Sequence, residues 1–290
     1  ADAFREQLPG VAVSVAGPGT GPGFSAFCAG EADVIGASRP IAAPEAEACA
    51  AGGLDYLELA IAVDGISVLT DPGSAFDCLA VEDLYALLGP ESRGFETWSD
   101  ANGLAAEVGA PYSPYPDDPL DITGPGPESG TYDEFVDFVV RGDAGGPNFE
   151  EARSEQWLGS TPPITAAAMR PDYITSADDD VIIEGVTSSD TSLGWVGYAY
   201  YTENADKVKA LAIDAGEGCI APLAGTIASG AYPLARPLFV YVNREAALSR
   251  PELVAFIDFF LSDDGLAEVT NAGYVSLDDY APTRAIWEGR

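Results

Sequence analysis

Histidine does not occur in this 290-residue chain, and lysine occurs at only two positions, Lys207 and Lys209. Without histidine the chain cannot form a Ser-His-Asp triad, a Cys-His pair or a histidine-ligated zinc or iron site. A Ser-Lys pair would depend on the segment NADKVKAL, whose lysines we expect on the exposed face of a short helix. The spacing of the carboxylates singles out no catalytic pair. We therefore expect a protein that is not an enzyme and has no metal or other cofactor.

Positive charge is also scarce, because 13 Lys and Arg face 47 Asp and Glu, which gives a formal net charge of -34. Such a surface repels nucleic acid and anionic membranes, so neither is expected as a partner. An acidic, lysine-poor composition also fits a halophilic-like protein that is kept soluble in high salt. The segments SADDDV and YPDDPLD lack the spacing of a calcium-binding EF-hand loop, and we interpret both as solvated acidic loops.

Cysteine occurs four times, as Cys28, Cys49, Cys78 and Cys219, and never in a CxxC pair. This spacing argues against zinc ribbons and redox motifs. The even number favours an exported protein with two disulfides, and free buried thiols are the alternative. No apolar run is long enough to span a bilayer. The chain opens without a basic and then apolar leader, so we expect that an export signal has been removed.

The order of apolar segments predicts an α/β protein with mostly parallel sheets. A helix stopped by Pro9-Gly10 is followed by a predicted strand at 11–17, a helix at 24–32 and a strand at 32–40. The alternation continues with a helix at 44–51, an apolar run at 57–70 and a helix at 81–88. Strands are then predicted at 181–189, 193–201 and 236–243, followed by a helix at 250–263. With 47% hydrophobic residues the chain can bury the cores of two lobes. In such folds ligands bind at the carboxyl ends of the strands.

Three polar loops lie where a ligand could be bound. GPGTGPG follows the first predicted strand, Arg39 ends the segment IGASR, and Ser129 and Thr131 precede the amphipathic segment at 132–140. Ser129 and Thr131 can form a plain helix N-cap. They can also bind an anion together with the backbone N–H groups at the positive end of the helix dipole. If two lobes face each other, the three loops can converge on one anion.

Four segments resemble, in family order, the periplasmic phosphate-binding proteins of phosphate ABC transporters: GPGTGPGFSAFCAGEADVIGASRPI, GPGPESGTYDEF, LGWVGYAYY and RPLFVYVN. The resemblance covers most of the chain and is strongest to the branch with an Ala-Ser-Arg-Pro motif. It implies a two-lobed flytrap, the type II periplasmic-binding-protein fold, with a two-segment hinge near 62–68 and 236–242. The implied function is binding of inorganic phosphate in the cleft between the lobes and its delivery to a membrane permease.

The resemblance also implies domains and contacts. Lobe I is expected at 1–66 plus 237–290 and lobe II at 67–236, with an insertion-like segment at about 142–172. The implied phosphate-binding residues are Thr20, Gly21, Ser38, Arg39, Ser129, Gly130 and Thr131. The family's other branch carries an aspartate at the position of Arg39 and an arginine at that of Pro125, so we interpret Arg39 as the replacement cation. A guanidinium can contact phosphate in bidentate fashion, which a lysine cannot match.

Discrimination of phosphate from sulfate requires an acceptor for the proton that monohydrogen phosphate carries. Asp64 is the first candidate, and its alternative role is that of a turn residue before Gly65. Glu128 is the second candidate, although we favour for it the role of an acidic residue near the start of a helix. Both assignments are expectations that the sequence leaves open.

The resemblance further implies disulfides Cys28–Cys49 in lobe I and Cys78–Cys219 in lobe II. Family members carry a strand and a Gly-Ser-Ser-Thr loop ahead of the helix that the first residues of this chain match. The segment 158–168 resembles this loop, but we favour chance similarity and leave Ser160 and Thr161 out of the predicted site.

The implied protein is a monomer in the periplasm or outside the cell, and a lipid anchor upstream remains open. Two alternatives remain open as well. One is a flytrap-fold surface or signalling protein that has lost or altered its anion binding, and the other is a secreted phosphatase. Four aromatic residues are expected in core and hinge packing and not in ligand binding: Trp195, Tyr198, Tyr200 and Tyr201.

Overall fold

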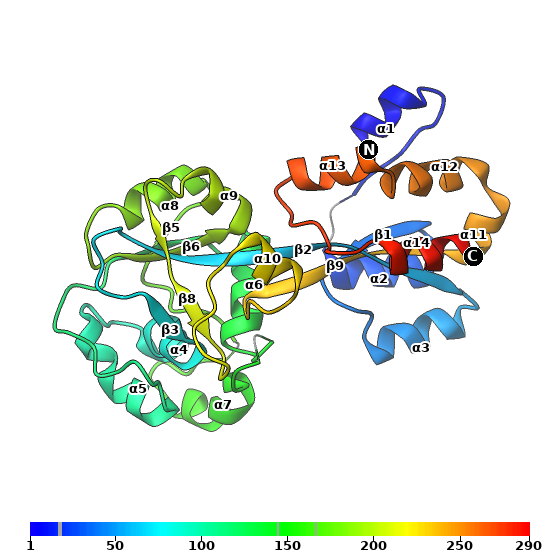
Figure 1. Cartoon of the computed structure of the whole chain (residues 1–290). Coiled ribbons are helices and arrows are strands. Elements are labelled where there is room, and N and C mark those ends of the chain that lie inside the picture. Colours follow the sequence, from blue (N-terminus) through cyan, green and yellow to red (C-terminus); the bar gives the residue numbers. More distant parts are fainter. Residues whose placement is uncertain (17–18, 144, 166) are drawn as a thin grey trace. The chain divides into compact units, whose positions relative to one another are not determined.

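The computed structural model describes residues 1–16, 19–143, 145–165 and 167–290. The chain divides into two compact units (Figure 1). Unit 1 comprises Ala1–Asp64, Ala228–Gly230 and Arg236–Arg290, and unit 2 comprises Gly65–Ile227 and Ala231–Ala235. Both units contain helices as well as strands, which confirms the predicted α/β class.

Unit 1 is built around three neighbouring strands. Strand β9 lies between β1 and the N-terminal part of β2, and β1 pairs with β9 in antiparallel register, with Val34 opposite Val242. Helices lie on both sides of these strands, with α12 and α13 on one side and α2 and α3 on the other (Figure 1). The elements are α1 Asp2–Gln7, α2 Thr20–Cys28, β1 Val34–Ala37, α3 Ala43–Ala51, β2 Tyr56–Thr70, β9 Ala235–Asn243, α11 Arg244–Ser249, α12 Pro251–Phe260, α13 Asp263–Asn271 and α14 Ala281–Glu288.

Two apolar clusters form the core of unit 1. In one cluster Leu57 and Leu59 of β2 pack with Ile257 of α12 and with Trp287 of α14. In the other, side chains of α2, β1 and β9 enclose Cys49, which is fully buried. Cys49 forms a disulfide with Cys28, at a sequence separation of 21 residues, and so ties α2 to α3. The packing of α2 against β1, together with the disulfide to α3, thus holds the end of β1 beside the start of α2.

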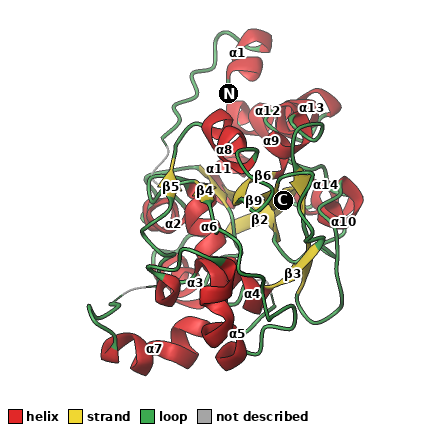
Figure 2. Ribbon diagram, turned by 90° about the vertical axis from the view of Figure 1, so that its left-hand side faces the viewer, coloured by secondary structure: helices red, strands yellow, loops and turns green. Residues whose placement is uncertain are grey.

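Unit 2 has a mixed sheet. Beyond Gly65, β2 pairs antiparallel with β6 and β7, whereas β4 pairs parallel with β5 and β6, and β3 pairs parallel with β8. The elements are β3 Cys78–Ala80, α4 Val81–Leu88, the 3₁₀ helices Pro90–Ser92 and Trp98–Ala101, α5 Asn102–Val108, β4 Ile122–Gly124, α6 Gly130–Val139, α7 Phe149–Gly159, β5 Ile174–Thr175, α8 Asp179–Val186, β6 Leu193–Gly197, α9 Tyr198–Glu203, β7 Lys209–Ala210, β8 Ala212–Asp214 and α10 Ala224–Ala228. Figures 1 and 2 show α8 and α9 on one side of β2 and β6, and α4, α5 and α7 on the other.

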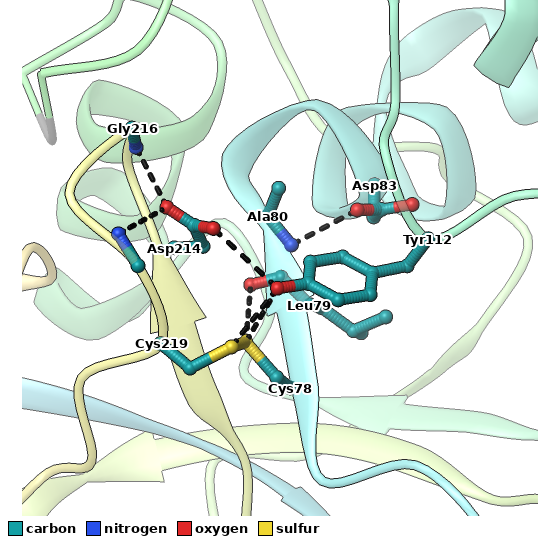
Figure 3. The surroundings of a disulfide bond; sticks show 9 residues. Cys78, Leu79, Ala80, Asp83, Tyr112, Asp214, Gly216 and Cys219 are labelled. Carbon is teal, nitrogen blue, oxygen red and sulfur yellow. Dashed lines mark hydrogen bonds between the residues drawn. A yellow bond between two sulfur atoms is a disulfide. The ribbon is translucent and has the colours of Figure 1, made fainter.

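A disulfide and a buried ion pair hold peripheral parts of unit 2. Cys78 of β3 bonds to Cys219, at a sequence separation of 141 residues, and the hydroxyl of Tyr112 lies 2.9 Å from the sulfur of Cys219 (Figure 3). Helix α7, within the predicted insertion-like segment, is anchored by Arg153, whose guanidinium donates to the Glu91 carboxylate at 2.5 and 2.9 Å. The chain thus contains both disulfides that the resemblance implied.

Several expected elements need correction. The apolar residues 11–16 form no strand, and most of them are exposed, because no neighbouring strand pairs with them. Residues 181–186 belong to helix α8 and not to a strand, because the Asp178 side chain caps that helix by accepting from the Asp180 N–H. The acidic segment SADDDV is therefore largely a helix start. Lys207 lies in a turn and Lys209 in β7, so the expected short helix is absent at these two residues.

The sheets also differ from the expectation of a mostly parallel sheet in each lobe. The β1–β9 ladder of unit 1 is antiparallel, and unit 2 mixes both orientations. The chain enters unit 2 through β2 and returns through β9, which brings β9 alongside β1 in the opposite direction. Among the aromatic residues expected in packing, Trp195 is fully buried, whereas the tyrosines of α9 are only half-buried. Over the described ranges, no helix combines the length and the apolar character that crossing a bilayer requires.

Candidate functional site

The predicted anion-binding residues of unit 1 lie at the start of α2 and after β1. Thr20 is the first residue of α2, and Ser38 follows β1 directly. Their hydroxyl oxygens are 3.1 Å apart, and the Ser38 N–H donates to the Thr20 hydroxyl oxygen at 3.3 Å. Two hydroxyls that are 18 residues apart in sequence are therefore side by side, as the prediction required.

Arg39 directly follows Ser38, and its guanidinium contacts Glu45, Pro40 and Phe24. Its two terminal nitrogens each donate to one oxygen of Glu45 at 2.8 Å, and Nη1 also donates to the Pro40 carbonyl at 3.1 Å. The guanidinium carbon lies 5.4 Å from the ring centre of Phe24, within the range of a cation–π contact. Phe24 follows Thr20 by one helical turn on α2, so the cation lies along the helix that begins with the hydroxyl. We call Thr20, Ser38, Arg39 and Glu45 the Arg39 group.

Glu45 is the acidic member of the Arg39 group. Its carboxylate accepts from Arg39 in bidentate geometry and also from the Ala42 N–H at 2.9 Å, at the start of α3. The hydrogen bond from Arg39 holds the pKa of Glu45 below its ordinary value of 4.5, with the Ala42 N–H as a lesser cause and burial acting in the opposite direction. At neutral pH the pair is therefore fully ionised, and the carboxylate balances the charge of the guanidinium.

The glycine-rich loop before α2 determines how the helix begins. Gly19 has a φ of 89°, a backbone conformation that favours glycine, and it is the N-cap residue of α2. Gly21 lies in the first turn, where backbone N–H groups have no partner within the helix. Gly17 and Pro18 of the predicted GPGTGPG loop lie outside the described residues.

The predicted residues of unit 2 form the N-terminus of α6, and we call Ser129, Gly130 and Thr131 the Ser129 group. Ser129 is the N-cap residue, and its hydroxyl oxygen accepts from the Thr131 N–H at 3.2 Å. Gly130 and Thr131 are the first two residues of the ten-residue helix. The plain N-cap interpretation is therefore correct. The first-turn N–H groups and the positive end of the helix dipole lie at the same helix start, which is a suitable place for an anion.

Aromatic side chains support the loop before the Ser129 group. The Tyr173 hydroxyl donates to the Pro125 carbonyl at 2.6 Å, and its ring lies 5.3 Å from that of Trp195. Trp195 is fully buried and also stacks on Phe135 of α6, with ring centres 4.6 Å apart. A Cβ on Gly124 would lie 2.7 Å from the Trp195 ring, so only glycine fits at this position. Burial raises the pKa of Tyr173, which keeps its hydroxyl protonated as a donor.

The candidates for a proton acceptor are placed differently. Asp64 is half-buried in the middle of β2, at the last position of this stretch of unit 1. Glu128 is exposed, directly before Ser129, and its carboxylate lies over Gly126, where a Cβ would come within 2.5 Å of it. Ser160, which was left out of the predicted site, donates to the Trp157 and Pro162 carbonyls. Ala166 of the segment 158–168 lies outside the described residues.

Sequence reasoning missed Glu45, Phe24 and Tyr173. A signal for Glu45 exists in APEAE, because a glutamate in the first turn after a proline commonly closes a helix start. Its pairing with Arg39 depends on how β1 and α3 are packed, which the sequence pattern does not show. Tyr173 is 48 residues from its partner Pro125, so no local spacing connects them.

Other features of the described residues do not point to a different site. A pocket of about 690 Å³ in unit 1 lies between α13 and α14, and it is lined by Thr270, Tyr280 and Arg284 among others, without any predicted anion-binding residue. Within the described ranges no three His, Cys, Asp or Glu side chains gather so that they could hold a metal ion. The Arg39 and Ser129 groups remain the candidate functional residues.

Comparison with known proteins identifies the family. A family model described as the PBP superfamily domain matches residues 1–264. The chain belongs to the PBP superfamily. Protein SphX of Synechocystis sp. is 35% identical over 280 residues, which cover 96% of this chain and 74% of SphX. The phosphate-binding protein PstS of Staphylococcus aureus is 32% identical over 267 residues, which cover 91% of this chain and 69% of PstS. The resemblance predicted from the four segments is thereby confirmed.

Two solved structures have a fold similar to that of this chain. A crystal structure described as a possible phosphate binding protein from Planctomyces limnophilus has a TM-score of 0.77 and 34% identity, and covers 100% of this chain and 89% of its own. An ABC-type phosphate transport receptor from Vibrio cholerae has a TM-score of 0.65 at 19% identity, and covers 95% of this chain and 92% of its own. The predicted flytrap fold class is confirmed by these likenesses.

Proposed function

We propose that this PBP-superfamily protein binds inorganic phosphate, without covalent chemistry, and delivers it to the membrane permease of an ABC transporter. The proposal is carried by one observation. The chain is 34% identical, over its whole length, to a protein described as a possible phosphate binding protein, and it has hydroxyl, amide and guanidinium donors at the predicted positions. The relatives SphX and PstS cover nearly the whole chain as well.

The chemistry of these groups suits a tetrahedral oxyanion. Arg39 supplies charge-assisted donors, and Thr20, Ser38 and Ser129 supply hydroxyls. Gly21 and Gly130, in the first turns of α2 and α6, supply backbone N–H groups. Hydrogen bonds to a charged partner contribute roughly 1.5–3 kcal/mol each, about twice the contribution of neutral ones. We propose all seven predicted residues as ligands of phosphate.

The strongly acidic surface does not exclude an anionic ligand. At physiological ionic strength, charges farther than about 8–10 Å from the ion are largely screened. Hydrogen bonds in direct contact with the ion are screened much less, so local donors dominate over the net charge of -34. The net charge should instead slow the encounter with phosphate at low salt.

Selectivity against sulfate requires an acceptor for the proton of monohydrogen phosphate. We keep Asp64 as the first candidate for this acceptor and Glu128 as the second. The exposed position of Glu128 favours an additional role beside the helix dipole of α6. An aspartate that meets sulfate in place of monohydrogen phosphate would repel it, because no proton is shared.

The remaining features of the proposal follow from the family. We propose that unit 1 and unit 2 act as the two lobes, close to the predicted division into 1–66 plus 237–290 and 67–236. We propose a monomer that works in the periplasm or outside the cell and has no enzymatic activity. All four cysteines form disulfides, which supports a location in an oxidising compartment.

The test is calorimetric titration of the purified protein with phosphate and then with sulfate, in moderate salt. We expect saturable heat with phosphate at one ion per chain and at least a hundredfold weaker binding of sulfate. Absence of heat with either ion would favour the surface or signalling alternative, and release of phosphate from an ester would favour the phosphatase. Light scattering after gel filtration measures the oligomeric state.

A further inference from the structure

We infer that Glu45 is a positioning residue, which holds the Arg39 guanidinium in the orientation that phosphate binding requires. This inference rests on the proposed function, because it concerns the same predicted ligand. Glu45 itself is not one of the residues that the family resemblance implies.

The contacts between Arg39 and Glu45 fix the orientation of the guanidinium and do not merely place the two side chains near each other. Both terminal nitrogens of Arg39 donate to Glu45 at 2.8 Å, which fixes the plane of the guanidinium as well as its position. The ring of Phe24 and the Pro40 carbonyl restrict it further. The Arg39 side chain is nevertheless 43% exposed, so burial alone would leave it mobile.

Two opposing effects decide what Glu45 contributes to anion binding. An arginine side chain that is ordered in advance loses less conformational freedom when the ion binds, which is an advantage of about 0.5–1.5 kcal/mol per side chain. The negative charge of Glu45 acts against this, because it repels the ion, but solvent and salt weaken that repulsion at a partly exposed pair. We expect the positioning effect to exceed the repulsion.

A purely structural role for Glu45 must be separated from this one, because its carboxylate also accepts from the Ala42 N–H at the start of α3. Loss of that contact would weaken α3 whether or not Arg39 is present. Positioning predicts something different, namely that substitution of Glu45 affects phosphate binding only while Arg39 is there. A double-mutant cycle distinguishes the two roles.

The experiment is calorimetric titration with inorganic phosphate of the wild type, Glu45→Ala, Glu45→Gln, Glu45→Asp, Arg39→Ala and the double variant Arg39→Ala/Glu45→Ala. Glu45→Asp retains the charge but shortens the reach to the guanidinium. Glu47→Ala is the matched control, because Glu47 is exposed on the same helix and its substitution removes the same charge. Thermal unfolding of each variant shows whether it is folded at the temperature of the titration.

We expect Glu45→Ala, Glu45→Gln and Glu45→Asp to weaken phosphate binding by roughly 3- to 10-fold, with Glu47→Ala unchanged. In the Arg39→Ala background, Glu45→Ala should change binding by less than about 2-fold. Stronger binding by Glu45→Gln with unchanged binding by Glu45→Asp would overturn the inference in favour of simple charge repulsion. Equal losses in both backgrounds would overturn it in favour of the helix cap. If the wild type itself does not bind phosphate, the proposed function fails, and this inference fails with it.

Discussion

The Arg39 group of unit 1 and the Ser129 group of unit 2, which we propose as ligands of phosphate, contain two different kinds of donor. The Arg39 group draws side chains from three segments, namely the start of α2, the residues after β1 and the start of α3, and it carries a full positive charge that Glu45 balances. The Ser129 group is one continuous helix start whose donors are neutral and are directed by the backbone of α6. A protein of net charge -34 can therefore present anion donors without any excess of positive charge around them.

The same contrast extends to the disulfides. Cys28–Cys49 closes a short loop that connects α2 with α3, close to the Arg39 group, whereas Cys78–Cys219 closes most of unit 2. The disulfide of unit 1 therefore constrains a short loop near the Arg39 group, and that of unit 2 constrains most of the unit. Four experiments test this contrast, beginning with the largest expected effect.

Removal of Cys78–Cys219 should destabilise the protein most. The double substitution to alanine should lower the free energy of unfolding of unit 2 by about 5 kcal/mol, against about 3 kcal/mol for removal of Cys28–Cys49 from unit 1, because the longer loop loses more entropy when it is closed. Denaturant unfolding of both variants under oxidising conditions measures the difference. A larger loss from the Cys28–Cys49 variant would reverse the comparison.

Arg39→Ala should cause the largest loss of affinity among single substitutions. Loss of charge-assisted hydrogen bonds should weaken phosphate binding by about 10- to 100-fold. Arg5→Ala is the control, because it removes the same charge and Arg5 forms an exposed ion pair with Asp2, three residues earlier on α1. Titration calorimetry measures both, and equal affinity of Arg39→Ala and Arg5→Ala would remove Arg39 from the ligands.

Ser129→Ala should weaken phosphate binding by only about 5-fold, because the hydroxyl is one neutral donor and the backbone N–H groups remain. It should also lower stability by about 1 kcal/mol through loss of the N-cap. Ser262→Ala is the matched control, since Ser262 caps α13 by accepting from the Gly265 N–H at 3.2 Å. That variant should show a similar stability loss with unchanged affinity. Weaker phosphate binding by both variants would mean that the loss of affinity comes from lower stability and not from a lost contact with the ion.

The smallest expected effect is a difference in pH dependence. The pKa of Glu45 is lowered by its hydrogen bond with Arg39, so its stabilising contribution is complete above about pH 4.5 and is lost as the pH falls through the lowered pKa. In unit 2, burial raises the pKa of Asp83 from 3.8, so its contribution declines as the pH rises through the raised pKa.

Unfolding experiments between pH 3 and pH 7 can separate the two trends. As the pH falls, the stability advantage of the wild type over Glu45→Gln should shrink. The stability of the wild type relative to Asp83→Asn should instead increase as the pH falls. Parallel trends for both variants would contradict the assignment of the two pKa shifts.

Much of the fold could be predicted from local patterns. The segment VEDLYALL has helical apolar spacing, and it forms α4 with the predicted bounds. The apolar run 57–70 forms most of β2. The failures have physical causes as well. Residues 11–16 are apolar enough for a strand but have no strand beside them, and the β-branched residues 181–183 form a helix because Asp178 caps it.

The parts of the candidate site that depend on a local sequence pattern could be predicted. Ser129 before an amphipathic helix indicates an N-cap without any tertiary information, and the structure has that cap. The meeting of Thr20 with Ser38 followed from the resemblance, not from spacing. The Arg39–Glu45 and Tyr173–Pro125 contacts arise from packing between separate segments, which a single sequence does not encode in any local pattern.

The fully buried indole of Trp195 gives the protein an intrinsic optical probe. The ring stacks on Phe135, which belongs to α6, and makes a tilted contact with Tyr173, whose hydroxyl donates to the carbonyl of Pro125. Any rearrangement of the chain around Ser129 changes the surroundings of this one chromophore, and the emission of a variant that keeps only Trp195 among the four tryptophans would report it without a label.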